Sequence, residues 1–452
     1  MTCCASNINR WRKLTLTACL PLLLFGAAGG SSASAQLCPA RLSPDTVPRR
    51  GFIHRLDAEW RPQYVFPTNN FFKNNDEYLE NSWDPIHHAK AFHLKYSFGF
   101  KPGTCADRIY AGAYQGLGLA FYNFGDRKRV GNPLLIYMFQ GASIARLGSR
   151  VSFNYEWNFG LSTGWHPYNE LTNRDNGVVG SKVNAYLNAG FYLRWALARH
   201  FDLTLGVDVT HFSNGNTKFP NAGVNTIGAK LGLAYNFNRT DEDLRPGTSS
   251  HPAHHFPKHF SYDLLFFGSW RRKGVYVEED RQLPSPKAYP VAGFNFATMY
   301  NLGYKFRCGV SVDGVFDGSA NVYAREPEDE SPSLLHYDKT GYSPQADEGM
   351  DYDTSSPQQE FIRPSASKQL ALGLSGRLEY VMPYFTINAG MGYNVLGKGD
   401  LRGWYQVLAL KIAMPRNTFL HIGYNLQNFK TPNYLMLGLG IRLHDKSPKV
   451  RH

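Results

Sequence analysis

The chain has 452 residues and a formal net charge of +12, with 14% aromatic residues, 43 glycines and only 19% charged residues. Of its six cysteines, three lie in the first 35 residues, while Cys38, Cys105 and Cys308 are too far apart for a disulfide framework or a zinc-binding spacing. Beyond the N-terminal segment no run of about 18 consecutive apolar residues occurs, so the sequence predicts no transmembrane helix. The positive charge suits an anionic surface, but charge alone decides no function.

Residues 1–35 have the pattern of a secretory signal peptide. Basic residues between Arg10 and Lys13 precede an apolar run over residues 14–29, and the small residues 33–35 offer a cleavage site. Residues 16–19 loosely resemble a lipoprotein box, but almost no hydrophobic segment precedes them. We therefore predict an exported chain.

After this segment, apolar and polar residues alternate with the period of two that β-strands show when their two faces meet different surroundings. In residues 183–197, for example, the row from Val183 to Leu197 is apolar, whereas the alternate row contains Asn184, Asn188 and Arg194. Strands of a soluble sandwich average about five or six residues, so rows this long favour strands that cross a membrane at a tilt of about 45°. The first half of the chain contains eight such strands, near residues 52–66, 92–100, 115–124, 133–145, 151–161, 183–197, 201–213 and 225–237.

The connections between these strands alternate in length. Tight turns are expected at 146–148 and 198–200, and long loops at 67–87 and 162–181. Outer-membrane barrels have short periplasmic turns and longer outer loops. If the strand that begins at residue 52 runs outward, the strand over 201–213 also runs outward and ends near the outer leaflet.

Residues 240–258 form a polar, proline-containing linker to a second set of strands. Its histidines at 251, 254 and 255, with His259, could bind a metal, but a solvated linker is the preferred interpretation because nothing in the flanks orients them. We divide the chain into a signal peptide (1–35), a first barrel half (50–239), the linker (240–258) and a second barrel half (259–445). The second half has about eight strands, near residues 260–270, 287–302, 304–318, 366–382, 383–397, 401–414, 417–428 and 433–444.

The C-terminal ends of the two halves have similar sequences, which indicates an ancient duplication. Pro220-Asn221 followed by the strand from Ile227 recurs as Pro432-Asn433 followed by the strand from Leu437. Where the first half has His-Phe-Ser-Asn at 211–214, the second has Asn-Leu-Gln-Asn at 425–428, so we predict no second active site. The loop 319–365 of the second half is strongly acidic; a solvated surface loop is preferred over a site for bridging divalent cations.

The strand over 201–213 carries the feature that points to chemistry. Its odd row is apolar from Leu203 to Val209 and then continues with His211 and Ser213, whereas the even row contains Asp202 and Asp208. A polar group that faces hydrocarbon without a partner costs several kcal/mol, so a polar pair in this row requires a reason. Either the pair lies at the level of the lipid headgroups, or it is a serine nucleophile with its histidine base, two residues apart on one face and able to lean together.

At this point the sequence resembles a known family, the lipid A 3-O-deacylases of the PagL type. Members are eight-stranded outer-membrane barrels with a His-x-Ser-Asn motif on the penultimate strand, and His211, Ser213 and Asn214 match that motif on strand seven of eight. The resemblance covers roughly residues 52–238. It implies that Ser213 attacks an acyl ester of lipid A, that His211 transfers the proton, and that Asn214 with the backbone around Gly215 and Asn216 stabilises the oxyanion.

One position departs from the family pattern. The family has a glutamate on the last strand to orient the histidine, and the corresponding residue here is Asn225. An asparagine can accept a hydrogen bond from His211 but cannot stabilise an imidazolium by charge. Glu170 or Asp175 in the outer loop could replace it, whereas the parity of Glu156 places that residue inside the barrel.

The sequence thus predicts an all-β, outer-membrane protein of about 16 strands, arranged as two tandem eight-stranded barrels or as one sixteen-stranded barrel. Its expected activity is that of a serine esterase acting on lipid A in lipopolysaccharide in the outer membrane of a Gram-negative cell, without a cofactor, a metal or a nucleic-acid partner. The alternatives are a porin or transport channel, in which His211 and Ser213 are incidental, and a structural barrel without catalytic function. A water-filled lumen would favour the channel, and packed lumens would oppose it.

Overall fold

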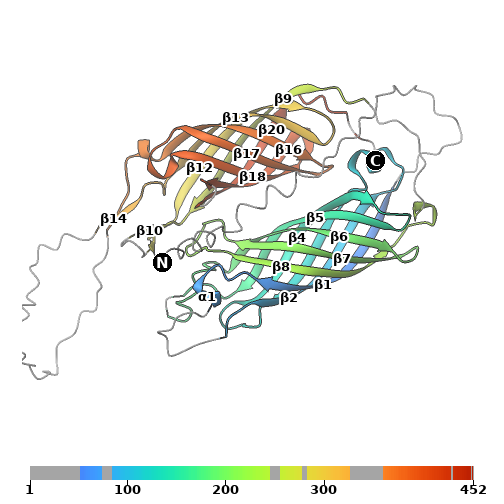
Figure 1. The fold of residues 1–452 in the computed structure, drawn as a ribbon. Coiled ribbons are helices and arrows are strands. Elements are labelled where there is room, and N and C mark those ends of the chain that lie inside the picture. The colour runs from blue at the N-terminus through green and yellow to red at the C-terminus, as the bar shows by residue number, and fades with distance from the viewer. Residues whose placement is uncertain are drawn as a thin grey trace, which may run out of the picture.

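The computed structural model describes residues 51–73, 84–169, 171–244, 255–276, 282–325, 360–428, 431–448 and 450. The predicted signal peptide, Glu170, His251, His254 and the acidic residues 326–353 lie outside the described residues. The structure is all-β and consists of two closed antiparallel barrels of eight strands each (Figure 1). Two tandem barrels were the first expectation and are confirmed; the alternative of one sixteen-stranded barrel is wrong, because the first and last strands of each half pair with each other.

The first barrel follows the chain order, and each strand pairs with its neighbours in sequence. Two short helices, α1 (Asn70–Lys73) and α2 (Cys105–Tyr110), lie in its connections. Its strands are β1 (Phe52–Val65), β2 (His88–Phe100), β3 (Tyr114–Asn123), β4 (Gly131–Arg146), β5 (Val151–Trp165), β6 (Val183–Ala196), β7 (Phe201–Ser213) and β8 (Val224–Asn236).

The second barrel has the same up-and-down order, with additions in its longer connections. Two small hairpins, β10 (Gly274–Tyr276) with β11 (Gln282–Pro284) and β14 (Tyr323–Arg325) with β15 (Glu360–Ile362), extend from one end. In the part of the chain that the structure describes, single turns of 3-10 helix occur at Glu242–Leu244, which follows β8, and in the second barrel at Ala366–Lys368, Gly399–Leu401 and Pro415–Asn417. The barrel strands are β9 (His259–Arg271), β12 (Tyr289–Asn301), β13 (Phe306–Asp317), β16 (Leu370–Val381), β17 (Phe385–Leu396), β18 (Gly403–Ala413), β19 (Thr418–Gln427) and β20 (Thr431–Leu443).

Both barrels are apolar outside and polar inside, the reverse of a soluble fold. On β2, Phe92 and Leu94 are 57% and 51% exposed, whereas His93 and Lys95 between them are 3% and 1% exposed. This inversion is the pattern of strands whose outer face meets lipid. Among the described residues, no helix is both long and apolar enough to span a membrane.

Buried ion pairs fill the middle of each lumen. In the first barrel, Lys95 and Lys230 contact Glu156 at 2.7 and 3.0 Å, and Arg61 contacts Asp208 at 2.6 Å. In the second, Asp263 accepts bonds from Lys411 at 2.8 Å and Arg442 at 2.6 Å. A charge away from water needs a partner of opposite sign, and these pairs supply it from facing strands.

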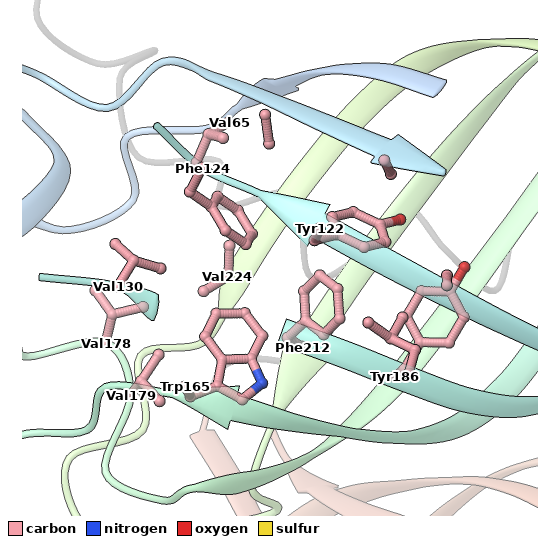
Figure 2. Packing of buried hydrophobic residues seen from close by; sticks show 14 of the residues in the cluster. Val65, Tyr122, Phe124, Val130, Trp165, Val178, Val179, Tyr186, Phe212 and Val224 are labelled. Atoms are coloured by element: carbon pink, nitrogen blue, oxygen red, sulfur yellow. The ribbon is translucent and has the colours of Figure 1, made fainter. Parts of the chain in front are cut away.

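An aromatic cluster closes the outer end of the first lumen (Figure 2). Phe212 lies at its centre, with ring centroids 4.9 Å from Trp165, 5.3 Å from Tyr122 and 5.4 Å from Tyr186. Val224 at the start of β8 belongs to the same cluster. The end of β7 is therefore anchored from inside the barrel.

The two barrels lie side by side, with part of the outer face of each packed against the other (Figure 1). Trp157 belongs to the outward row of β5 yet is 7% exposed, because Phe385 of β17 packs edge-on against it at 5.3 Å. Nearer the end with the tight turns, the hydroxyl groups of Tyr155 and Tyr380 are 3.1 Å apart. Side chains that the alternation assigns to lipid here form a protein–protein contact within one chain.

Candidate active site

His211 and Ser213 lie on the outward row of β7, at the end of the barrel that carries the long loops. Successive side chains on a strand point to opposite faces, so the inward Phe212 between them fixes their direction. Because Phe212 is only 1% exposed within the aromatic cluster, the end of β7 has little freedom to rotate about the strand axis. The pair thus faces the membrane side of the barrel near its outer rim.

The imidazole of His211 is held by the neighbouring strand. His211 pairs with Asn225 in the register of β7 and β8, and its Nδ1 lies 2.7 Å from the side-chain oxygen of Asn225. With that oxygen as acceptor, Nδ1 carries the proton and Nε2 keeps its lone pair. The ring also lies against Gly223, where an added Cβ would come within 2.9 Å of His211 Cε1.

The hydroxyl of Ser213 receives two hydrogen bonds. Asn221 donates through Nδ2 at 2.9 Å, and the backbone N–H of Gly215 donates at 3.1 Å. The side-chain oxygen of Asn221 also accepts from the backbone N–H of Asn214 at 3.0 Å. No hydrogen bond joins Ser213 to His211 in the described residues, so the close approach that the sequence pattern allows is not formed here.

After Ser213 the chain makes a tight turn. Gly215 and Asn216 both have positive φ, of +65° and +61°, and the backbone N–H of Thr217 donates to Asn214 O at 3.3 Å. Positive φ at both central positions is typical of a type I′ turn, in which glycine and asparagine are favoured. The side chain of Asn214 is buried, and its amide nitrogen and oxygen have no hydrogen-bond partner in the described structure.

The described acidic residues that were considered as orienting groups, Glu156 and Asp175, form no hydrogen bond with His211. Glu156 points into the lumen, where it accepts bonds from Lys95 and Lys230. Asp175 is exposed, and no hydrogen bond joins it to His211; Glu170 lies outside the described residues. The residue that orients the imidazole in this structure is therefore the amide Asn225.

Sequence reasoning missed two neighbours of the pair, Asn221 and Gly223. Both lie in the segment between β7 and β8, which follows no strand periodicity. A signal for Asn221 was present, because the dipeptide Pro220-Asn221 recurs in the second half as Pro432-Asn433. The arrangement brings a serine, a histidine and hydrogen-bond donors together at one end of the outward row of β7.

Two family models match the chain, one on each barrel. Residues 56–234 match the model described as lipid A 3-O-deacylase (PagL), and residues 260–445 match the model described as acyloxyacyl hydrolase, C-terminal domain. No curated individual protein matches the chain.

Among the similar solved structures are several outer-membrane proteins of low sequence identity. Neisserial surface protein A is 12% identical over 42% of this chain and 98% of its own, with a TM-score of 0.26. The Acinetobacter baumannii outer membrane protein Omp33 is 8% identical over 87% of this chain and 99% of its own (TM-score 0.15), and the Pseudomonas putida toluene transporter TodX is 10% identical over 89% and 88% (TM-score 0.15).

The matched models together span both barrels and most of the chain. The resemblance seen in the sequence is thus confirmed for the first half and extends to the second. The first barrel matches the lipid A 3-O-deacylase (PagL) family and the second the acyloxyacyl hydrolase C-terminal domain, as expected of a duplicated PagL-like form with two barrels.

Proposed function

We propose that the first barrel is a serine esterase that removes the acyl chain at the 3-position of lipid A. The observation that carries this proposal is the hydrogen bond of 2.7 Å between His211 and Asn225, beside a serine on the same lipid-facing row. The family match supports a hydrolase acting on lipid A. The serine mechanism and the position of the cleaved ester are further parts of our proposal, which the family match does not supply.

In the first step, Ser213 Oγ forms a bond to the ester carbonyl carbon while its proton moves to His211 Nε2. Ser213 must first rotate from Asn221 towards the imidazole, a small adjustment of the kind that substrate binding produces. The tetrahedral intermediate then collapses as the bond to the 3-oxygen of lipid A breaks, and that oxygen takes the proton from His211. The acyl chain remains as an ester on Ser213.

In the second step, water attacks the acyl-serine after giving a proton to His211 Nε2. The intermediate collapses with return of that proton to Ser213 Oγ, and the fatty acid leaves. Each step places negative charge on the former carbonyl oxygen. The backbone N–H of Gly215, the Nδ2 of Asn221 and the unpartnered amide of Asn214 are donors beside Ser213 that could receive it.

Asn225 has the role of orienting residue in this scheme. Its oxygen keeps the proton of His211 on Nδ1, which leaves Nε2 free to accept the proton of serine. Because an amide carries no charge, it stabilises the imidazolium less than a carboxylate does. We therefore expect a slower enzyme than one with glutamate at this position.

The test is incubation of the purified full-length protein with defined hexa-acylated lipid A, followed by mass spectrometry of both products. The proposal expects release of one 3-hydroxy fatty acid and a lipid A that lacks the 3-O-linked chain. Release of a secondary acyl chain from an acyloxyacyl group would overturn the assigned position. No release from any position would overturn the esterase.

The channel alternative receives less support. The lumens are occupied by buried ion pairs such as Arg61–Asp208 and Lys411–Asp263, and the outer end of the first lumen is closed by the cluster around Phe212. A water-filled pore needs an open lumen.

A further inference from the structure

The second barrel touches the turn that follows the candidate nucleophile. The backbone N–H of Arg272, the residue that follows β9, donates to Asn216 O at 2.9 Å. Asn216 in turn extends its Nδ2 to within 3.5 Å of the backbone oxygen of Asn433 in β20. The two contacts attach one residue of the turn to two strands of the other barrel.

Gly215 faces side chains of the same surface. An added Cβ there would lie 3.5 Å from Tyr424 Cε2 on β19 and 3.6 Å from Leu435 Cβ and Cδ1 on β20. These are ordinary van der Waals distances for a Cβ that glycine lacks, so the two side chains face the turn with room for about one methyl group between them and Gly215. The backbone N–H of this glycine also donates to Ser213 Oγ.

In the strand register, Tyr424 and Leu435 occupy the places that His211 and Asn225 occupy in the first barrel, with Tyr424 one residue before the Asn425 that the sequence motif aligns with His211. The sequence repeat equates Ile227 with Leu437, and therefore Asn225 with Leu435. Asn225 pairs with His211 across β7 and β8, as Leu435 pairs with Tyr424 across β19 and β20. The degenerate copy of the site thus supplies the surface on which the turn of the intact copy rests.

We infer that the second barrel is a positioning partner of the active site, in which Tyr424 and Leu435 hold Gly215 so that its N–H stays directed at Ser213. This inference rests on the proposed function. A stabilising donor is effective only if it is already in place when charge develops, and a donor in a short surface turn is in place only when that turn is supported.

The ring of Tyr424, and not its hydroxyl, makes the contact. The hydroxyl is buried without a hydrogen-bond partner in the described structure, while a ring carbon is the atom nearest to the position that a Cβ on Gly215 would take. Tyr424→Phe is therefore expected to retain full activity. Leu420 and Leu439 form a matched control, because they pair across the same two strands on the same outward row, four register pairs further from the turn.

The experiment compares full-length wild type, Tyr424→Ala/Leu435→Ala, Tyr424→Phe, Leu420→Ala/Leu439→Ala and Ser213→Ala. Loss of one oxyanion donor in a serine hydrolase costs about 10²–10³ in kcat, so a loosened donor should cost about tenfold. We expect this loss in kcat for the first double variant, with KM within about threefold and an equal slowing of Ser213 labelling by a fluorophosphonate. Tyr424→Phe and the control pair should stay within about twofold of wild type.

Two results would overturn the positioning role while leaving the esterase intact. One is wild-type kcat in Tyr424→Ala/Leu435→Ala when Ser213→Ala is inactive. The other is an equal loss of kcat in the control pair, which would indicate general weakening of the barrel. If Ser213→Ala is as active as wild type, the proposed function fails and the inference falls with it.

Discussion

Asn225 is an unusual partner for a histidine that has to accept a proton. The bond of 2.7 Å to His211 orients the ring, but the amide brings no negative charge to the imidazolium. The side chain faces the outer surface of the barrel, where an unpaired carboxylate would be costly. Orientation without charge is what this site provides.

Changes at Asn225 separate these two contributions. Asn225→Ala should lower kcat by tenfold or more, because the tautomer and direction of His211 are no longer fixed. Asn225→Glu should raise kcat above wild type, because a carboxylate stabilises the imidazolium in the transition state. Fatty-acid release measured at saturating substrate gives both values, with Asn123→Ala, at the exposed end of β3, as the neutral control. Equal rates in all three variants and wild type would show that Asn225 has no catalytic part.

At the residue scale, strand parity predicted which side chains of the candidate site share a face. His211, Ser213 and Asn225 are all outward, and Glu156 is inside the lumen, as the alternation indicates. Parity could not predict Asn221, because its segment is placed by contacts with another loop. The bond from Gly223 N to Val178 O at 3.2 Å is one of them, and such pairing leaves no periodic pattern in the sequence.

At the scale of the element, the two faces at the end of β7 have different roles: the inward side chain anchors the strand, and the outward side chains form the candidate site. Phe212 packs inside the barrel on Trp165 and Tyr122, while its two neighbours face the membrane (Figure 2). A strand end fixed in this way keeps the spacing of its functional residues without contacts to them.

Phe212→Ala should therefore reduce both stability and activity. Removal of a fully buried phenylalanine costs about 3–5 kcal/mol, and the end of β7 loses its anchor. The urea midpoint of the heat-modifiable gel band should decrease, and kcat should decrease more than in Phe237→Ala, which removes an exposed ring beyond β8. A variant with a lower midpoint but unchanged kcat would contradict the anchoring role.

The predicted strands of both barrels agree with the observed ones to within a few residues, because lipid outside and polar groups inside impose a strict period of two. The largest differences in the first barrel are at β2, which begins at His88 rather than at residue 92, and at β5, which ends at Trp165 rather than at residue 161. At the start of β2 the polarity of the two rows reverses: the exposed residues His88 and Lys90 are polar, while the buried residues Ala89 and Ala91 are apolar. Polar residues face outward where a strand emerges into the headgroup region, and apolar periodicity stops before the strand does.

At the scale of the whole molecule, the pattern could not decide between one barrel and two. Closure depends on pairing of β1 with β8 and of β9 with β20, which are far apart in sequence. Nor could it predict the contact between the barrels, because Trp157 and Phe385 have the same place in the alternation as residues that face lipid. Only the arrangement in space distinguishes a protein neighbour from a lipid neighbour.

Two barrels with occupied lumens should not conduct ions. The pairs Lys95–Glu156 and Lys411–Asp263 bridge facing strands in the middle of each lumen. Full-length protein inserted into a planar bilayer should give no discrete conductance steps under conditions in which a general porin does. Regular steps from wild-type protein, absent from protein-free detergent controls, would favour a channel instead.

The most direct test of the central claim is mass spectrometry of lipid A from cells that express wild-type protein, Ser213→Ala or neither. Heat-modifiable gel migration first establishes that both proteins fold into barrels in the membrane. We predict that lipid A from wild-type cells lacks one 3-hydroxyacyl chain, and that lipid A from Ser213→Ala cells is identical to that of cells without the protein. Equal deacylation by wild type and Ser213→Ala would contradict the account, because the hydrolysis would then not depend on this serine.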